Sequence, residues 1–154
     1  MKKLLLTLCP ACPLWVSAGP IEVGQALPTL SLQNQHGQAW RIAPDTQMVI
    51  FAAGRTASNL VMAVLSSQPK GWLTSRQAVY LADMSKMPGF ITRTFALPAL
   101  REQPFEVGVS LDAKTLADWP RQEDAVTLIR LDQGRVIGRD HASTEGQLKA
   151  ALGL

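Results

Sequence analysis

The two cysteines are the residues whose type and spacing most directly suggest chemistry, and both lie near the N-terminus. Cys9 and Cys12 form a Cys-Pro-Ala-Cys sequence, and a C-x-x-C pair exchanges disulfides when it opens a helix after a strand. Here the pair interrupts an apolar segment that has no strand before it. We interpret both cysteines as incidental residues of a leader, although a retained leader would keep both thiols.

Residues 1–18 have the organisation of a secretory signal peptide. A pair of lysines supplies the positive start, residues 4–16 are apolar, and small residues precede a cleavage site after Ala18. The apolar stretch is too short for a comfortable membrane span. We predict cleavage after Ala18, a periplasmic or secreted location, and a single domain over residues 19–154 that contains no cysteine.

Histidine and methionine supply the next candidates for catalysis or metal binding. His36 lies in a predicted turn and His141 at a predicted strand end, and the sequence has no G-x-S-x-G elbow, so we expect no Ser-His-Asp hydrolase. Met84 and Met87 follow Asp83 at the end of a predicted strand, where thioethers could bind Cu(I). Methionine is also a common core residue, and we predict no metal site and no cofactor.

Nucleotide and nucleic-acid binding lack their sequence signals. Gly54 stands alone after its strand, without the further glycines or the Lys-Ser/Thr pair of a phosphate loop. The Gly54-Arg55 step could still hold a small anion at a helix N-terminus. The formal charge is +3, with two of the cations at Lys2 and Lys3, and the arginines are scattered among acids. Nucleic-acid binding needs a basic cluster, so we expect no nucleic-acid partner.

The apolar residues predict short strands that alternate with helices. Residues 23–42 are typical of a hairpin around Gln35-His36-Gly37-Gln38. The other expected strands are 47–53, 78–83, 105–111, 125–131 and 135–139, and the expected helices are 57–65, 90–100, 113–119 and 144–152. Ser143 or Thr144 would cap the last helix, and Gln147 could complete a capping box.

The segment between the second and third of these strands carries large apolar residues at helical spacing. They are Met87, Phe90, Ile91, Phe95, Leu97 and Leu100. We interpret them as the core-facing stripe of a packed helix, bent at Pro98. The alternative is a groove for a partner.

Strands that alternate with helices predict a sheet with parallel members and helices on both faces. The last two strands, joined by Asp132-Gln133-Gly134, should pair as a hairpin and make the sheet mixed. The sequence therefore predicts an α/β fold in which helices flank a mixed central sheet, with an N-terminal β-hairpin.

Three segments resemble the thioredoxin superfamily, and more narrowly its peroxiredoxin-like branch. They are 23–32 with Gly37, 48–53 leading into 54–59, and 126–129 with Gly134 and 146–149. The first is similar to the start of a peroxiredoxin, the second to the strand and helix that flank the active site, and the third to the closing hairpin and helix of thioredoxins. Together they sample most of residues 21–154, and the resemblance implies a thioredoxin-like fold.

The resemblance also shows which family residues are missing. Thioredoxins place C-x-x-C at this strand-to-helix turn, where the helix N-terminus stabilises a thiolate, and those two positions fall on Thr56 and Asn59. The peroxiredoxin pattern P-x-x-x-T-x-x-C falls on Ala52, Thr56 and Asn59 and keeps only the threonine. The family's cis-proline falls on Val126, where we predict a trans bond because a cis bond would cost about 2.5–4 kcal/mol.

The working hypothesis is an exported, redox-inactive binding or accessory module rather than an enzyme. The resemblance implies a binding surface at the lost active site, formed by Arg55, Thr56, Asn59 and Val126. Its partner, an unknown protein or a small ligand, and its oligomeric state are not identified by the sequence. After cleavage we expect no stable membrane span. The alternative is a membrane-tethered thiol oxidoreductase that keeps the leader and uses its two cysteines.

Overall fold

Apolar runs form strands and amphipathic segments form helices across residues 20–154, the part of the chain that this computed structural model describes. The strands are β1 (Leu32–Asn34), β2 (Ala39–Trp40), β3 (Met48–Ala53), β4 (Ala78–Asp83), β5 (Val107–Ser110), β6 (Val126–Asp132) and β7 (Arg135–Ala142). The helical segments are α1 (Arg55–Leu65), α2 (Trp72–Ser75), α3 (Gly89–Ile91), the π-helical turn η1 (Thr92–Ala96), α4 (Leu97–Arg101) and α5 (Glu145–Leu152). The short helix α2 was not predicted.

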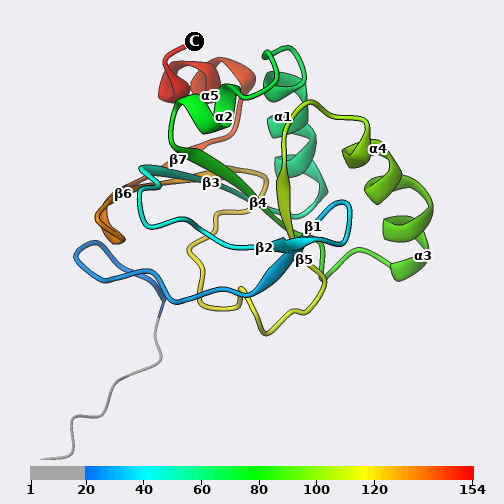
Figure 1. The fold of residues 1–154 in the computed structure, drawn as a ribbon, viewed down its shortest axis with the longest axis horizontal. Coiled ribbons are helices and arrows are strands. Elements are labelled where there is room, and N and C mark those ends of the chain that lie inside the picture. The colour runs from blue at the N-terminus through cyan, green and yellow to red at the C-terminus, as the bar shows by residue number, and fades with distance from the viewer. Residues whose placement is uncertain (1–19) are drawn as a thin grey trace, which may run out of the picture.

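The strands form one seven-stranded sheet in the order β2-β1-β5-β4-β3-β6-β7 (Figure 1). Strands β3, β4 and β5 are parallel to one another, whereas β6 is antiparallel to β3 and β7 is antiparallel to β6. Strands β1 and β2 form the predicted N-terminal hairpin at the far edge. The sheet is therefore mixed, and the predicted fold class is confirmed.

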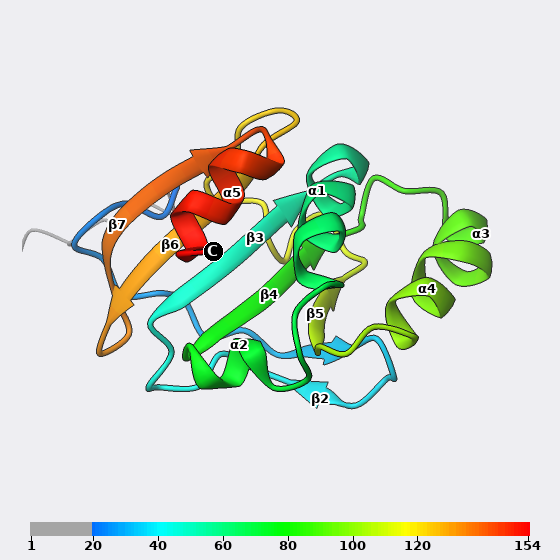
Figure 2. The same cartoon turned by 90° about the horizontal axis from the view of Figure 1, so that it is seen from above.

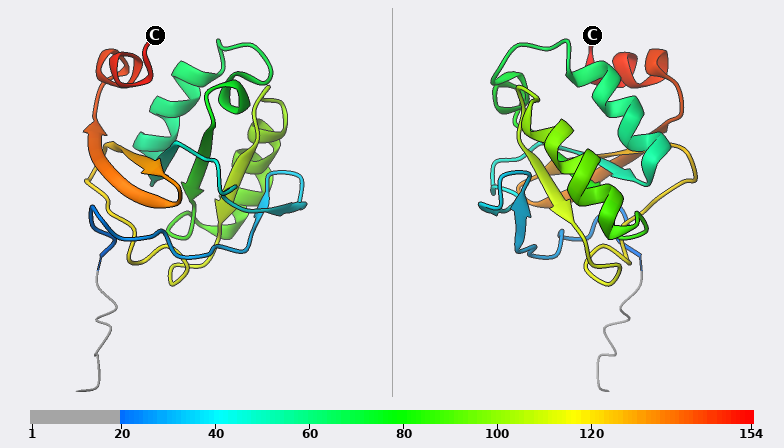
Figure 3. Two further views of the ribbon diagram at one scale, coloured as in Figure 1. Left: turned by 60° about the vertical axis from the view of Figure 1, so that its left-hand side comes forward. Right: turned by 90° about the vertical axis from the view of Figure 1, so that its right-hand side faces the viewer.

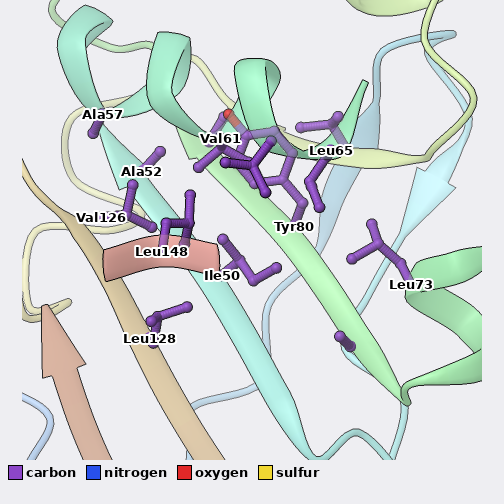
Figure 4. Close-up of a cluster of buried hydrophobic side chains, with 14 of the residues drawn as sticks. Ile50, Ala52, Ala57, Val61, Leu65, Leu73, Tyr80, Val126, Leu128 and Leu148 are labelled. Carbon is purple, nitrogen blue, oxygen red and sulfur yellow. The ribbon is translucent and has the colours of Figure 1, made fainter. Parts of the chain in front are cut away.

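Two apolar cores lie on opposite faces of this sheet, because successive side chains of a strand point to opposite sides. On the helical face, Ile50 and Leu128 pack with Val61 of α1 and Leu148 of α5 (Figure 4). Residues of α2 and α4 join the same core. In Figure 1, α1, α2 and α5 lie above the strands and α3 and α4 lie to their right, and Figure 2 shows the molecule from above.

The second face is covered by irregular chain, and the helix predicted over residues 113–119 is wrong. These residues form turns, in which Asp112 Oδ1 accepts a hydrogen bond from the Lys114 amide and the Arg121 guanidinium donates to the Leu116 carbonyl oxygen. Such bonds compete with helical ones. Leu116 still enters the second core. Helices thus flank one face only, and the expectation of helices on both faces is wrong as well (Figure 3).

The prediction that the apolar residues of the helix 89–101 form a core-facing stripe is also wrong. Phe90, Ile91 and Phe95 are exposed, whereas Leu100 is buried. The π-helical turn inserts extra backbone into this helix, so residues at ordinary helical spacing do not keep a common face. Pro98 lies just beyond that turn and has no amide to donate.

The last helix follows its predicted cap closely. The Gln147 backbone amide donates to Thr144 Oγ1 at 3.2 Å, and Gln147 Oε1 accepts from the Ser143 backbone amide at 2.9 Å. The capping box therefore reaches one residue further back than the motif requires. Residues 1–18, with the predicted signal peptide and both cysteines, lie outside the described residues. Between residues 20 and 154 no helix has both the length and the apolar character to cross a bilayer.

Candidate functional site at the β3–α1 junction

The turn between β3 and α1 depends on a glycine. Gly54 has φ 93° and ψ 173°, a combination that residues with a side chain almost never adopt. No side chain caps α1, and its first turn has no acidic residue. The first amides of the helix therefore face the end of β3 without a capping side chain, and they carry the positive end of the helix dipole.

The structure places three of the four predicted site residues together on this surface. Arg55, Thr56 and Asn59 are exposed in the first two turns of α1, whereas Ala57 points into the core. None of the three exposed side chains takes part in a hydrogen bond or salt bridge with another residue between 20 and 154. Their polar groups are thus available to solvent or to a partner.

Val126 is close to this surface but is not part of it. It pairs with Ala52 across β6 and β3, is fully buried, and lies near Ala57 (Figure 4). Its peptide bond is trans, as predicted, because there are no cis bonds among residues 20–154. Val126 supports the junction from below, and a partner at the surface would not touch it.

Thr127 and His141 form a pair on the other face of the sheet. Thr127 Oγ1 and His141 Nδ1 are 3.1 Å apart, and Thr127 is buried. Burial lowers the pKa of His141 and the charge of Arg139 adds to this, while Asp140 opposes it. Since Thr127 alternates with Val126 along the strand, the pair faces away from α1. His36 lies in the hairpin turn, far along the sheet order from β6.

An ion pair beside the junction was not predicted. Asp83, at the end of β4, accepts from Arg121 Nη1 at 3.0 Å and from the Ser85 amide at 3.0 Å. The Asp83 side chain is 4% exposed and that of Arg121 is 31% exposed. The guanidinium also lies 5.4 Å from the Phe51 ring centre. This ion pair links the irregular chain that covers the second face to the C-terminal end of β4.

A pocket of about 500 Å³ opens next to this ion pair. It is lined by Ala53, Gly54, Asp83, Lys86, Arg121, Gln122, Glu123 and Asp124. One sequence feature points to this pocket, since Asp83 ends a buried strand where α/β proteins form sites. Arg121 comes from a distant loop, so only the fold brings it to Asp83.

The methionines considered as copper ligands do not share an open site with Asp83. Met84 is buried in the helical-face core, and Asp83 is occupied by Arg121 and the Ser85 amide. Across residues 20–154 there is no group of three or more His, Cys, Asp or Glu side chains placed to hold a metal ion. Met84 thus has the packing role of a core residue.

Solved structures resemble this chain over most of its length. A thiol:disulfide interchange protein DsbE from Chlorobium tepidum, described as putative, matches with a TM-score of 0.59 and 14% identity, covering 86% of this chain and 94% of its own. Peroxidoxin BcpB from Mycobacterium tuberculosis matches with a TM-score of 0.56 and 11% identity, covering 86% and 95%. A protein disulfide isomerase from Bacteroides thetaiotaomicron, again putative, gives 0.57 and 10%, covering 86% and 87%.

At identities of 10–14% these matches show a common fold and not a common activity. No protein-family model matches the sequence, and no curated protein matches it. The fold of residues 20–154 is thioredoxin-like, with neighbours from both the disulfide-exchanging and the peroxiredoxin groups. This agrees with the resemblance that the sequence motifs indicated.

Proposed function

We propose that this thioredoxin-like chain is an exported protein that performs no thiol or peroxide chemistry at the β3–α1 junction and acts there as a binding or accessory module. One observation carries the proposal. At the turn where the fold would present a thiolate to the start of a helix, the exposed residues are Thr56 and Asn59. All residues from 20 to 154 lack a thiol.

The side chains at the junction cannot replace a thiolate. An amide such as that of Asn59 neither ionises nor attacks a disulfide or a peroxide. A hydroxyl such as that of Thr56 needs a neighbouring base to become a nucleophile, and within residues 20–154 no hydrogen bond joins it to a titratable group. The junction thus keeps the geometry of an active site without its reactive group.

The same surface is suited to binding. Arg55 offers a guanidinium, Thr56 a hydroxyl and Asn59 an amide, all exposed on one end of α1. Uncapped helix amides lie beside them. Together these groups donate many hydrogen bonds from a rigid helix, which supports recognition of a polar protein segment or a small polar ligand. Export rests on the leader sequence of residues 1–18.

An activity measurement tests the negative half of the proposal. The full chain and its C9S/C12S variant would be assayed for disulfide reduction and for peroxide reduction. We expect neither protein to turn over substrate at an enzyme-like rate. Activity that disappears in C9S/C12S would favour the membrane-tethered oxidoreductase, whereas activity that survives this substitution would place a reactive group elsewhere and overturn the proposal.

Site-specific crosslinking tests the positive half. A photoreactive residue would be placed at Asn59 and, as a matched control, at Ala63, which is exposed one turn further along α1. We expect adducts from position 59 in cells and few from position 63, and Arg55→Glu should reduce them. Equal labelling at both positions, or labelling that ignores Arg55→Glu, would contradict a binding surface at this junction.

A further inference from the structure

The solvent-facing side of the helix 89–101 carries large apolar side chains. Phe90 is 70% exposed, Phe95 is 60% exposed and Ile91 is 37% exposed. Exposed aromatic residues that gather on one face of a protein mark a contact site more often than isolated ones do. This face, defined by Phe90, Ile91 and Phe95, is called the aromatic face below.

The π-helical turn brings the two phenylalanines together. Residues five apart in a regular α-helix point about 140° away from each other, at about 3.6 residues per turn. A π-helical turn contains more residues per turn, and η1 begins two residues after Phe90 and includes Phe95. The centres of the Phe90 and Phe95 rings are 6.2 Å apart, at an angle of 85°. The pair is thus an edge-to-face contact made in solvent.

The charged residues within the segment 84–101, which carries the aromatic face, have one sign. Residues 84–101 include Lys86, Arg93 and Arg101 and no acidic residue. Neither Lys86 nor Arg93 forms a salt bridge with any residue that the structure describes. The preceding acid, Asp83, is buried and paired with Arg121 on the other face of the sheet. Arg93 thus lies between the two phenylalanines in the sequence without a salt bridge, and Lys86 precedes them at the edge of the pocket beside Gly54.

The position of the aromatic face favours a partner with a broad surface rather than one that fits into a groove of this protein. Segment α3 lies at an outer corner of the molecule in two perpendicular views (Figures 1 and 2). Rings that are 60% or more exposed project from that corner rather than line a groove. A projecting pair of rings needs no complementary pocket if it enters a fluid apolar phase. A second copy of the chain is a poor match, because it would bring the same cations face to face.

We propose that the aromatic face attaches this protein to the surface of an anionic lipid bilayer. Phe90, Ile91 and Phe95 enter the boundary between headgroups and acyl chains, and Lys86 and Arg93 contact the anionic headgroups. Interfacial helices combine apolar insertion with basic residues in this way. The contact lies on the surface and does not span the bilayer. It is independent of the binding surface formed by Arg55, Thr56 and Asn59.

Vesicle co-sedimentation tests the proposal with defined lipids. The full chain would be mixed with vesicles of phosphatidylcholine alone or of phosphatidylcholine with phosphatidylglycerol. Because the apolar leader can bind lipid by itself, the readout is the difference between variants. F90S/F95S should weaken partitioning into the anionic vesicles about tenfold or more, given the transfer free energy of two phenyl groups. The matched control is I137S, since Ile137 is 59% exposed on β7, and it should bind like the parent.

Charge variants supply the second measurement. K86Q/R93Q should bind anionic and neutral vesicles more equally, and raising the ionic strength should weaken the parent more than this variant. Circular dichroism would verify that each variant is folded, which their surface positions favour. If F90S/F95S binds as the parent does, or if K86Q/R93Q keeps the full preference for anionic lipid, the proposal is overturned.

The result also separates this inference from the proposed function. R55E should leave vesicle binding unchanged while it reduces crosslinking at position 59. If the parent shows no lipid binding and F90S/F95S instead loses a protein that a photoreactive residue at the exposed position Thr94 captures, the aromatic face binds a protein and the lipid proposal fails. The lipid experiments do not probe the β3–α1 surface, so their failure would leave the proposed function of that surface unchanged.

Discussion

Tyr80 places one polar atom, its hydroxyl oxygen, inside the apolar core of this protein. It is fully buried under α1, and its hydroxyl has no hydrogen-bond partner of good geometry among the described residues. Burial raises its pKa to about 12, and the nearby Ser58 side chain opposes the rise. An unpaired hydroxyl in an apolar core costs free energy. The ring is retained for its volume and for its contact with Phe105.

The ionisation of Tyr80 gives a prediction that is simple to measure, because it is the only tyrosine in the chain. Below pH 10 the phenol is neutral in both states and the full stability is present. Between pH 10 and about 12 only the unfolded state loses its proton, so stability should fall by about 3 kcal/mol over this interval. Absorbance titration of tyrosinate should show a midpoint near 12 for the folded protein and near 10 in denaturant.

Tyr80→Phe is the matched variant for this titration. It removes the unpaired hydroxyl and keeps the ring, so we expect unchanged or slightly higher stability at neutral pH. The tyrosine contribution to the alkaline fall should vanish. A folded-state midpoint near 10, or a large loss of stability in the Phe variant, would show that the hydroxyl has a partner or access to water.

The sequence predicted the exposed positions of Thr56 and Asn59 correctly but not the burial of Val126. Thr56 and Asn59 were found because a motif has fixed spacing from a strand, and such spacing survives when the reactive residues change. Val126 is the position before Thr127 at the start of a strand, where the resemblance places the family's cis-proline. It is buried rather than on the predicted surface, because burial depends on what packs above it. Asp83 and Arg121 are 38 residues apart in sequence, and no local pattern connects them.

Individual elements differ in how far local sequence controls them. The cap of α5 is local, and Thr144 and Gln147 specified it correctly. The helix 89–101 lies close to its predicted bounds of 90–100. The prediction of its core-facing side assumed a regular helical period, which the π-helical turn interrupts. The segment 111–125 has helical spacing at Leu116 and Trp119, yet its backbone forms isolated turn bonds between residues three apart and bonds to side chains, rather than a regular helix.

The ion pair between Asp83 and Arg121 should decide the stability of that segment. Arg121→Met leaves a carboxylate that is 4% exposed without its cation. We expect unfolding free energy to fall by about 1–3 kcal/mol, less than for a fully buried pair, because the Arg121 side chain is itself 31% exposed. Denaturant unfolding measures this loss, and limited proteolysis should cut residues 111–125 sooner.

Lys114→Met is the control for the lost cation. Lys114 lies in the same segment, is exposed, and has no salt bridge to another residue between 20 and 154. Its replacement should change stability by less than about 0.5 kcal/mol. If both variants behave alike, the ion pair does not hold the segment, and the pocket beside Gly54 has another support.

The whole molecule combines a complete fold with a junction that lacks its reactive residues. The seven-stranded mixed sheet with its helices resembles solved thioredoxin-like structures over 86% of the chain. The only thiols of the chain are those of Cys9 and Cys12. Whether the protein keeps any thiol therefore depends on whether residues 1–18 are removed.

Intact mass of the protein recovered from the cell envelope tests this directly. If the signal peptide is cleaved after Ala18, the mass should match residues 19–154 and a thiol assay should find none. A mass that retains the leader, or that carries lipid on a cysteine, would contradict cleavage and restore thiols to the molecule. The C9S/C12S variant removes any lipid attachment site. It should have the same mass as the parent if residues 1–18 are cleaved and a lower mass if they are retained, because serine has oxygen in place of sulfur.

The sequence by itself determined most of the strands and helices, the closing β6–β7 hairpin that makes the sheet mixed, the cap of α5 and the identity of the residues at the β3–α1 turn, because each of these depends on neighbours that are close in sequence. Only the tertiary structure decided that Val126 is buried, that Arg121 reaches Asp83, that one face of the sheet has no helix, and that Phe90 and Phe95 meet in solvent. These features depend on contacts between distant segments and on one irregular helical turn, which no local period encodes.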